Sequence, residues 1–341
     1  FPGCSACFGS SEMILWQSAF GHLSLQQEKP VKLDTLYDLA SLTKIVGTTS
    51  VAACLIEQKK LSLNDPVVKW VPEFSADQLK SEFTEFRQKI TIRQLLTHTS
   101  GLPAWKPIYK SADSYRETIG NICETALEQA PQAKYRYSDL GMMLLGEVLS
   151  RAGGAALPKL ERELIFNPLK MTHTLRNPEP EKRSMIAPTE RIGDSDRFWQ
   201  GVVHDENSRG GEGITGHAGL FSNVTDLAKF AQAWLIAVRG GKSLVTSEIA
   251  QTFASRQNLP GDARRGLGWQ MFSKGGSGGS LLSDSAFGHT GFTGTSLWID
   301  PVKNLFLILL SNRVHPTRQN SRHLAVRRNF ADAVIGAVEQ N

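Results

Sequence analysis

Residues 37–46 read Tyr-Asp-Leu-Ala-Ser-Leu-Thr-Lys-Ile-Val, and in this stretch Ser41 stands three residues before Lys44. Apolar residues recur at helical spacing from there to Ile56, which predicts a first long helix over residues 41–59. Side chains three positions apart share one face of a helix, so the hydroxyl and the amine are expected to meet. The positive end of the helix and burial are expected to lower the lysine pKa and make it a base. Alone, the same residues are also typical of a helix N-cap followed by a solvated lysine.

Strand patterns occupy both ends of the chain, and helical patterns occupy most of the interval between them. The predicted strands are residues 4–9, 12–20, 266–272, 287–300 and 305–312. The predicted helices are residues 90–96, 114–129, 138–152, 157–165, 225–238 and 319–339. Residues 179–221 show neither pattern and predict a long loop, a kind of segment that is usually functional.

This order of elements predicts an α/β (α+β) fold, in which an antiparallel β-sheet is flanked by helices and carries an inserted all-helical domain. We expect residues 1–60 and 257–341 to form the sheet domain. Residues 61–256 are expected to form a mainly helical domain that also supplies active-site loops. No internal repeat is visible.

The composition is that of an ordinary globular protein, with 341 residues, 40% hydrophobic and 21% charged residues. The net charge of +5 is scattered and predicts no nucleic-acid partner. The densest basic spots, Arg264-Arg265 and Arg327-Arg328, are interpreted as solvated surface. The longest apolar run, residues 305–310, is far shorter than the roughly 18–20 residues of a membrane span, so none is expected.

Two further stretches contain groups that are able to take part in chemistry. Tyr137 and Asp139 stand at the start of the helix predicted over 138–152, where a phenol near Ser41 is able to exchange protons with its hydroxyl. The alternative is a capped helix with a packed tyrosine. Residues 288–294, Gly-His-Thr-Gly-Phe-Thr-Gly, open a strand. Their small residues let a ligand approach the backbone, although a Gly-rich edge strand has the same pattern.

Neither a metal nor a cofactor is expected. His204 and His217 lie near carboxylates in the 179–221 loop, but their spacing is irregular, so they are predicted to contact substrate instead of a metal. Cys4 and Cys7 match C-x-x-C without a second pair and are interpreted as small buried thiols. Residues 275–279 match G-x-S-x-G, but no helix follows them, so they predict a flexible loop.

Taken together and in this order, Ser41-x-x-Lys44, Tyr137-Ser-Asp139 and His289-Thr-Gly291 resemble the three motifs of the serine β-lactamase and penicillin-binding protein superfamily. The flanking stretches at 95–102, 216–222 and 288–295 are similar to its class C β-lactamase-like branch. That branch contains D,D-carboxypeptidases, D-aminopeptidases, family VIII esterases and an N-acetylmuramoyl-L-alanine amidase. The likeness spans about residues 1–339.

The resemblance implies roles for named residues. Ser41 would be the acylated nucleophile, and Lys44 and Tyr137 would share the duty of general base. The backbone N–H groups of Ser41 and Phe292 would form the oxyanion hole. The residues implied to contact substrate are Asp139, His289, Thr290 and Gly291, together with His204 and His217.

Two departures narrow the expected function. His289 stands where many β-lactamases have lysine, and Asp139 stands where asparagine is usual. An ionised aspartate only accepts hydrogen bonds, whereas asparagine also donates them. We therefore expect a serine hydrolase that works through an acyl-enzyme on a cell-wall-derived peptide or amide, of the D,D-carboxypeptidase or muropeptide amidase type. β-Lactams are expected to be weak ligands at most.

Two alternatives stay open from the sequence, a promiscuous esterase of the family VIII type with weak β-lactamase activity and a non-catalytic muropeptide-binding sensor. The chain begins with Phe1, and relatives of this kind usually carry a helix before the Phe-Pro-Gly stretch. We expect a trimmed N-terminus and a location in the cell envelope, either periplasmic or secreted.

Overall fold

A six-stranded antiparallel sheet built from both ends of the chain is the centre of the computed structural model, which describes residues 1–26, 28–76, 79 and 81–339. The strand order is β2-β1-β9-β8-β7-β6, so residues 4–9 pair with residues 306–311. The strands are β1 (Gly3–Gly9), β2 (Ile14–Gly21), β6 (Gln270–Met271), β7 (Phe287–Thr290), β8 (Ser296–Asp300) and β9 (Leu305–Ser311). The antiparallel sheet that the sequence predicts is therefore confirmed.

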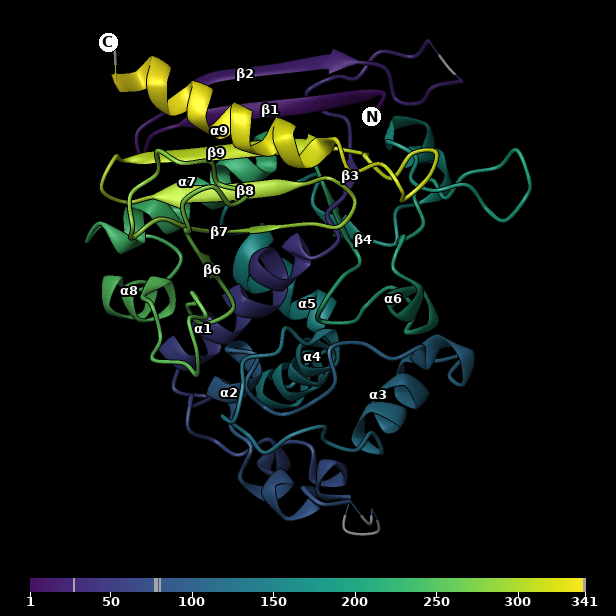
Figure 1. Ribbon diagram of the computed structural model, residues 1–341, viewed down its shortest axis with the longest axis vertical. Coiled ribbons are helices and arrows are strands. Elements are labelled where there is room, and N and C mark those ends of the chain that lie inside the picture. The colour runs from purple at the N-terminus through teal and green to yellow at the C-terminus, as the bar shows by residue number, and fades with distance from the viewer. Residues whose placement is uncertain (27, 77–78, 80, 340–341) are drawn as a thin grey trace.

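Helices cover both faces of this sheet. Helix α7 (Val224–Val238) packs against β1, β8 and β9 on one face, and α9 (His323–Glu339) crosses the other face (Figure 1). Every residue of β9 is buried, which explains why its sequence is a continuous apolar run instead of an alternating one. A separate apolar cluster joins the sheet to α9 and includes Trp298, Leu307 and Val334.

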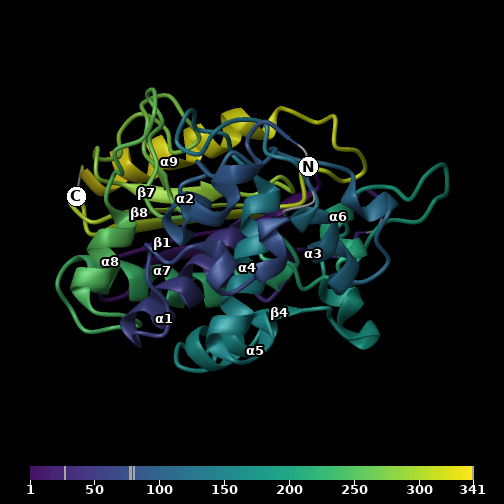
Figure 2. The same cartoon turned by 90° about the horizontal axis from the view of Figure 1, so that it is seen from below.

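The remaining helices form a second region, which lies below the sheet in Figure 1 and toward the viewer in Figure 2. They are α1 (Ser50–Glu57), α2 (Ile92–Leu96), α3 (Tyr115–Cys123), α4 (Asp139–Gly153), α5 (Leu157–Glu161), α6 (Glu206–Gly210) and α8 (Ser247–Ala254). Helix α4 lies in the middle of the main core, since Leu140 and the following apolar residues up to Leu149 are buried. The Ser138 hydroxyl caps it by accepting the Gly141 N–H at 3.0 Å.

A short three-stranded sheet connects the helical region to the large sheet. Its strands are β3 (Tyr37–Asp38), β5 (Leu220–Ser222) and β4 (Leu175–Arg176), in that order. Strand β3 comes immediately before the Ser41 turn, and β5 follows the segment that carries His217. The loop predicted over residues 179–221 is therefore only partly irregular, because it contains α6 and β5.

Several predicted elements have different bounds. The strand predicted over 287–300 is two strands, because Gly291 N–H donates to the Thr295 carbonyl at 2.7 Å and Gly294 has a φ of 118°, which closes a turn. The first helix begins after Ser41, and its residues Lys44–Thr49 form a wide π-helical turn before α1. Helix α3 ends at Cys123, six residues before the predicted end at 129.

The division into a sheet domain and a helical domain stays a prediction, and its expected end at residue 341 lies outside the described residues. Helix α7 falls within the range expected for the helical domain, yet it packs on the sheet. Among the described residues no single helix has the length and hydropathy of a membrane span. The pair formed by Asp139–Gly153 and Leu157–Phe166 reaches that length only with a 72° bend.

Candidate active site

The Ser41 turn is held in an unusual backbone conformation by a buried carboxylate. Ala40, the residue before the serine, has a φ of +46°, a value that is costly for a residue with a side chain. The two oxygens of Asp38 accept the N–H of Ala40 at 2.8 Å and the N–H of His204 at 2.7 Å. Asp38 therefore fixes the turn before the serine and ties it to the segment that carries His204.

Lys44 is fully buried and has three oxygen partners. Its Nζ donates to Ser41 Oγ at 2.9 Å and to the His217 carbonyl at 3.1 Å. The same nitrogen lies 2.7 Å from Asp139 Oδ1. Three acceptors use all three protons of an ammonium group, so the geometry is that of a charged lysine.

The predicted lowering of the Lys44 pKa is wrong. Burial does lower it, but the Asp139 carboxylate, followed by Tyr137, outweighs burial and raises the pKa above its ordinary value. The helix terminus next to Lys44 does not decide its pKa, because the decisive charge comes from Asp139 on a different helix, α4. Lys44 is therefore a fixed positive charge that donates a hydrogen bond to Ser41.

The carbonyl that accepts from Lys44 belongs to a rigid segment. Arg176 Nη1 donates to the carbonyls of Gly213 and Ala218, at 2.9 and 3.0 Å, on either side of His217. Arg176 is itself held by two hydrogen bonds to the fully buried Glu161, at 2.7 and 2.8 Å. The two hydrogen bonds between Arg176 and Glu161 fix the arginine, which in turn fixes the segment whose His217 carbonyl accepts from Lys44.

Tyr137 lies between charged and aromatic groups. Lys44 Nζ is 5.0 Å from its ring centroid, and Arg265 Cζ is 5.3 Å from it. The rings of His98 and His289 lie 4.6 and 5.9 Å from the same ring. His98 accepts the Ser138 N–H at 3.2 Å, so its ring bonds to the backbone.

His289 is a neutral ring at this site. Burial, followed by the charges of Arg265 and Lys44, holds its pKa well below the ordinary value. Its Nδ1 lies 2.9 Å from the Thr290 carbonyl, a contact that requires the proton on Nδ1. The remaining nitrogen, Nε2, can accept a hydrogen bond from substrate but has no proton to donate.

Two cavities of about 500 Å³ and 510 Å³ meet at Ser41, Tyr137, Phe292 and Arg318. We call the first the aromatic cavity, because Trp105 and Tyr109 line it. The predicted residues Asp139, His204 and His217 also line the aromatic cavity. We call the second the arginine cavity. It is lined by the predicted residues His289, Thr290 and Gly291, together with Arg265, Arg313 and Arg327.

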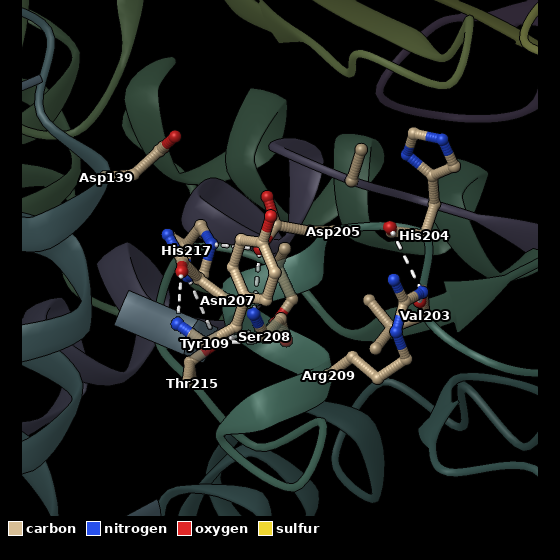
Figure 3. Close-up of polar contacts among 12 residues, drawn as sticks. Tyr109, Asp139, Val203, His204, Asp205, Asn207, Ser208, Arg209, Thr215 and His217 are labelled. Atoms are coloured by element: carbon tan, nitrogen blue, oxygen red, sulfur yellow. Dashed lines mark hydrogen bonds and ion pairs between the residues drawn. The ribbon is translucent and has the colours of Figure 1, made fainter. Parts of the chain in front are cut away.

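The structure thus gathers the predicted site residues around one cleft, with Lys44 buried and hydrogen-bonded to Ser41, although their roles stay predictions. His204 and His217 use their rings within the protein. His217 Nε2 lies 2.8 Å from Asp205 Oδ1, and its Nδ1 lies 3.1 Å from Thr215 Oγ1 (Figure 3). His204 Nε2 lies 3.0 Å from Glu190 Oε2. No group of three or more His, Cys, Asp or Glu residues in the described part of the chain is arranged to hold a metal.

The arginines are the residues that sequence reasoning missed. The pairs Arg264-Arg265 and Arg327-Arg328 are not simply solvated surface, since one member of each pair lines the arginine cavity. Arg327 is only 5% exposed, whereas Arg328 is exposed. Neighbouring residues on a helix point in different directions, which the pair pattern alone does not resolve.

A family model described as Beta-lactamase matches residues 1–331. The chain belongs to the β-lactamase family. It is 33% identical to a putative D-alanyl-D-alanine carboxypeptidase of Escherichia coli K12, over 354 residues that cover 92% of this chain and 79% of the relative. It is 32% identical to an N-acetylmuramyl-L-alanine amidase of Bacillus subtilis 168, over 355 residues that cover 92% and 78%.

A solved structure has the same fold as this β-lactamase-family chain. It is that of the octameric penicillin-binding protein homologue from Pyrococcus abyssi, with a TM-score of 0.74 and 22% sequence identity. The match covers 98% of this chain and 74% of that one. The family model and the relatives agree that the protein is a hydrolase of the β-lactamase family, as the resemblance implied.

Proposed function

We propose that this β-lactamase-family protein is a serine hydrolase that acts on a cell-wall-derived peptide or amide through an acyl-enzyme at Ser41. The observation that carries the proposal is the 2.9 Å contact of Lys44 Nζ with Ser41 Oγ, at the junction of the two cavities. A nucleophile at such a junction is open to an acyl group on one side and a leaving group on the other.

Tyr137 is the proton acceptor in this proposal. Because Lys44 keeps its proton beside Asp139, it cannot take a second one from Ser41. The phenolate of Tyr137 takes the serine proton while Ser41 Oγ forms a bond to the substrate carbonyl carbon. Tyr137 then gives that proton to the departing amine as the amide bond breaks. In the second half of the reaction, water replaces Ser41 as the nucleophile. Tyr137 takes a proton from the water as its oxygen attacks the acyl carbon, and it returns a proton to Ser41 Oγ as the ester bond breaks.

The oxyanion is assigned to the backbone N–H groups of Ser41 and Phe292. The peptide around Phe292 is well fixed, because Arg313 Nε donates to the Phe292 carbonyl at 2.7 Å. Preorganised donors of this kind stabilise the developing negative charge without moving. Phe292 itself is stacked between the His204 ring, 5.8 Å away, and the Arg313 guanidinium, 4.3 Å from its ring.

The names of the two relatives support an orientation for the substrate. In both reactions that these names describe, the released amine carries a carboxylate. The acyl group is a peptidyl group in the first reaction and a sugar-linked acyl group in the second. The arginine cavity therefore receives the leaving amine, and the aromatic cavity holds the acyl part. Cell-wall fragments as substrates also favour a place in the cell envelope, periplasmic or secreted, which fractionation of the native cells would test.

The mechanism is tested by intact-protein mass spectrometry after reaction with a fluorophosphonate probe. We expect one adduct on the wild type and none on Ser41→Ala. The matched control is Ser277→Ala, which removes the serine of the G-x-S-x-G stretch at 275–279 and is expected to label fully. An adduct that persists in Ser41→Ala would refute the assignment of the nucleophile.

The substrate class is tested with defined muropeptides, a D-Ala-D-Ala peptide, nitrocefin and short p-nitrophenyl esters. We expect muropeptide or peptide turnover to exceed nitrocefin turnover. Ester turnover far above all amide turnover would favour the esterase. Tight muropeptide binding without any turnover would favour the sensor.

A further inference from the structure

The arginine cavity carries more positive charge than the proposed chemistry at Ser41 requires. Four arginines line its volume of about 510 Å³, and no Asp or Glu is among the described residues that line it. One of the four, Arg318, is neutralised by ion pairs with Glu190 and Glu206, at 2.6 and 2.7 Å. The other three have no such partner among the described residues.

Arg313 and Arg327 are 7% and 5% exposed, and both are held by backbone carbonyls instead of carboxylates. Arg327 Nη2 donates to the carbonyls of Gly291 and Thr295 at 2.6 and 2.8 Å. Arg313 Nη1 donates to the carbonyl of Arg318 at 2.6 Å. Arg265 lies over the rings of Tyr135 and Tyr137. Within the described ranges, no carboxylate lies within ion-pair distance of these three guanidinium groups.

Gathering three such charges in one partly enclosed space is unfavourable in the absence of an anion. Burial, followed by the charge of Arg313, lowers the pKa of Arg327 to about 10. Burial and the charge of Arg318 likewise lower the pKa of Arg313. Both pKa shifts reflect the cost of burying positive charges close to one another, and a bound anion would reduce that cost.

We propose that the arginine cavity binds a leaving group that carries at least two carboxylates, as an acidic peptide does and a single terminal alanine does not. One carboxylate neutralises one guanidinium and leaves two charges without a counter-charge. The cavity volume is also far larger than one alanine residue needs. The inference rests on the proposed function, because it names the substrate half that leaves Ser41.

The carboxylates reach two different depths of the cavity. Arg265 lies beside Tyr137, with its Cζ 5.3 Å from the ring centroid, and the first carboxylate of the released amine would lie near this pair. Arg313 and Arg327 lie beside the turn 291–295 and the chain that leads into α9. A second carboxylate, several bonds further from the scissile amide, would face this pair.

The test uses hydrolysis of a neutral p-nitrophenyl ester as the reporter, with free peptides as competitors. The competitors are the dipeptide alanyl-glutamate with both carboxylates free, its single amides and its diamide. We expect each carboxylate removed to weaken inhibition about tenfold, as a partly desolvated charge pair with arginine would. Equal inhibition by the diacid and the diamide would overturn the proposal.

Variants separate charge from structure. In Arg265→Gln the ratio of inhibition constants for diamide and diacid is expected to fall about tenfold. In Arg264→Gln, the neighbouring arginine that pairs with Asp284 outside the cavity, the ratio is expected to stay unchanged. A variant that merely loosens the site weakens both competitors equally and leaves the ratio as it was. An equal ratio in both variants would therefore contradict the assignment.

Two further arms keep the outcomes distinct. Inorganic phosphate tests whether any small anion suffices, and inhibition by phosphate that is stronger than by the diacid would overturn the assignment to a peptide. If the ester is not turned over at all, the serine hydrolase proposal fails by itself. Calorimetric titration with the diacid and the diamide then still measures the preference of the cavity.

Discussion

The two cavities that meet at Ser41 treat charge in opposite ways. In the aromatic cavity each carboxylate has a partner within the protein, in the pairs Asp139–Lys44, Asp205–His217 and Glu206–Arg318. In the arginine cavity Arg265, Arg313 and Arg327 have no carboxylate partner among the described residues. Paired charges fix the geometry of the protein, whereas charges without a counter-ion are available to a ligand. The position of a charge in a cleft is thus less informative than whether the protein neutralises it.

The largest expected effect follows from breaking the Lys44 pair with Asp139→Asn. Removing the Asp139 carboxylate removes the largest effect that opposes burial, so the pKa of Lys44 falls and the ammonium is lost at lower pH. We expect kcat/KM to fall about 10²- to 10³-fold and the alkaline limb of its pH profile to move to lower pH. The profile of the control Asp196→Asn, whose carboxylate is fully exposed, should match the wild type. An unmoved alkaline limb would contradict the assigned charge of Lys44.

A second test removes the carboxylate that holds His217, with Asp205→Asn. Burial raises the pKa of Asp205, but the His217 ring and the Ser208 N–H outweigh it and hold the pKa below the ordinary value. We expect the variant to lose about 2–3 kcal/mol of unfolding free energy at pH 7. Chemical denaturation across pH provides the measurement.

The sign of its pH dependence follows from that lowered pKa. The folded protein binds the Asp205 proton less readily than the unfolded chain, whose aspartates titrate near about 3.9. The stabilisation is therefore present above that pH and lost as the pH falls through the lower pKa of the folded state. The difference between wild type and variant should shrink below about pH 4, and a difference that grows there would be inconsistent with the pair.

Salt should distinguish the two cavities through the substrates that they hold. Raising the ionic strength from about 0.05 M to about 0.5 M should lower kcat/KM about tenfold for a substrate with two carboxylates on its leaving group. The kcat/KM of a neutral ester should change less than about twofold, because the ester carries no charge and the charges of the aromatic cavity are already paired within the protein. Equal salt sensitivity would remove the distinction.

The smallest effect is expected for Arg318→Gln. This arginine touches both cavities, but its charge is already neutralised by Glu190 and Glu206. In this variant we expect the ratio of inhibition constants for diamide and diacid to change by at most about threefold, because a partly exposed, paired charge contributes little to binding. A loss as large as that of Arg265→Gln would show that pairing does not decide which arginines bind ligand.

The sequence predicts the layout of this site well because its motifs combine local spacing with a family likeness. Ser41 and Lys44 meet as the three-residue spacing requires, and Tyr137 lies beside Lys44, with its ring centroid 5.0 Å from Nζ. The charge state of Lys44 could not be predicted from the sequence. It depends on which way the Asp139 side chain points across the core, and that is set by the packing of α4, not by local sequence.

The buried arginine of α9 could have been found from the sequence. Arg327 is four, seven and eight residues before Ala331, Val334 and Ile335, and all four residues are buried. This is the spacing of one helix face, so the pattern places Arg327 on the apolar side of the helix predicted over residues 319–339. Arg265 gave no such signal, since it precedes a strand of only two residues, β6.

The pairing of β1 with β9 determines when, during synthesis of the chain, the active site is able to form. A ribosome completes Ser41 long before it reaches Phe292, and β1 remains without one of its two neighbours until residues 306–311 are made. At roughly 5–20 residues per second, the 251 residues from Ser41 to Phe292 take about 13–50 s to synthesise. Throughout this interval the nascent chain holds its nucleophile but lacks the turn that faces it, so the cleft forms only when synthesis is nearly complete.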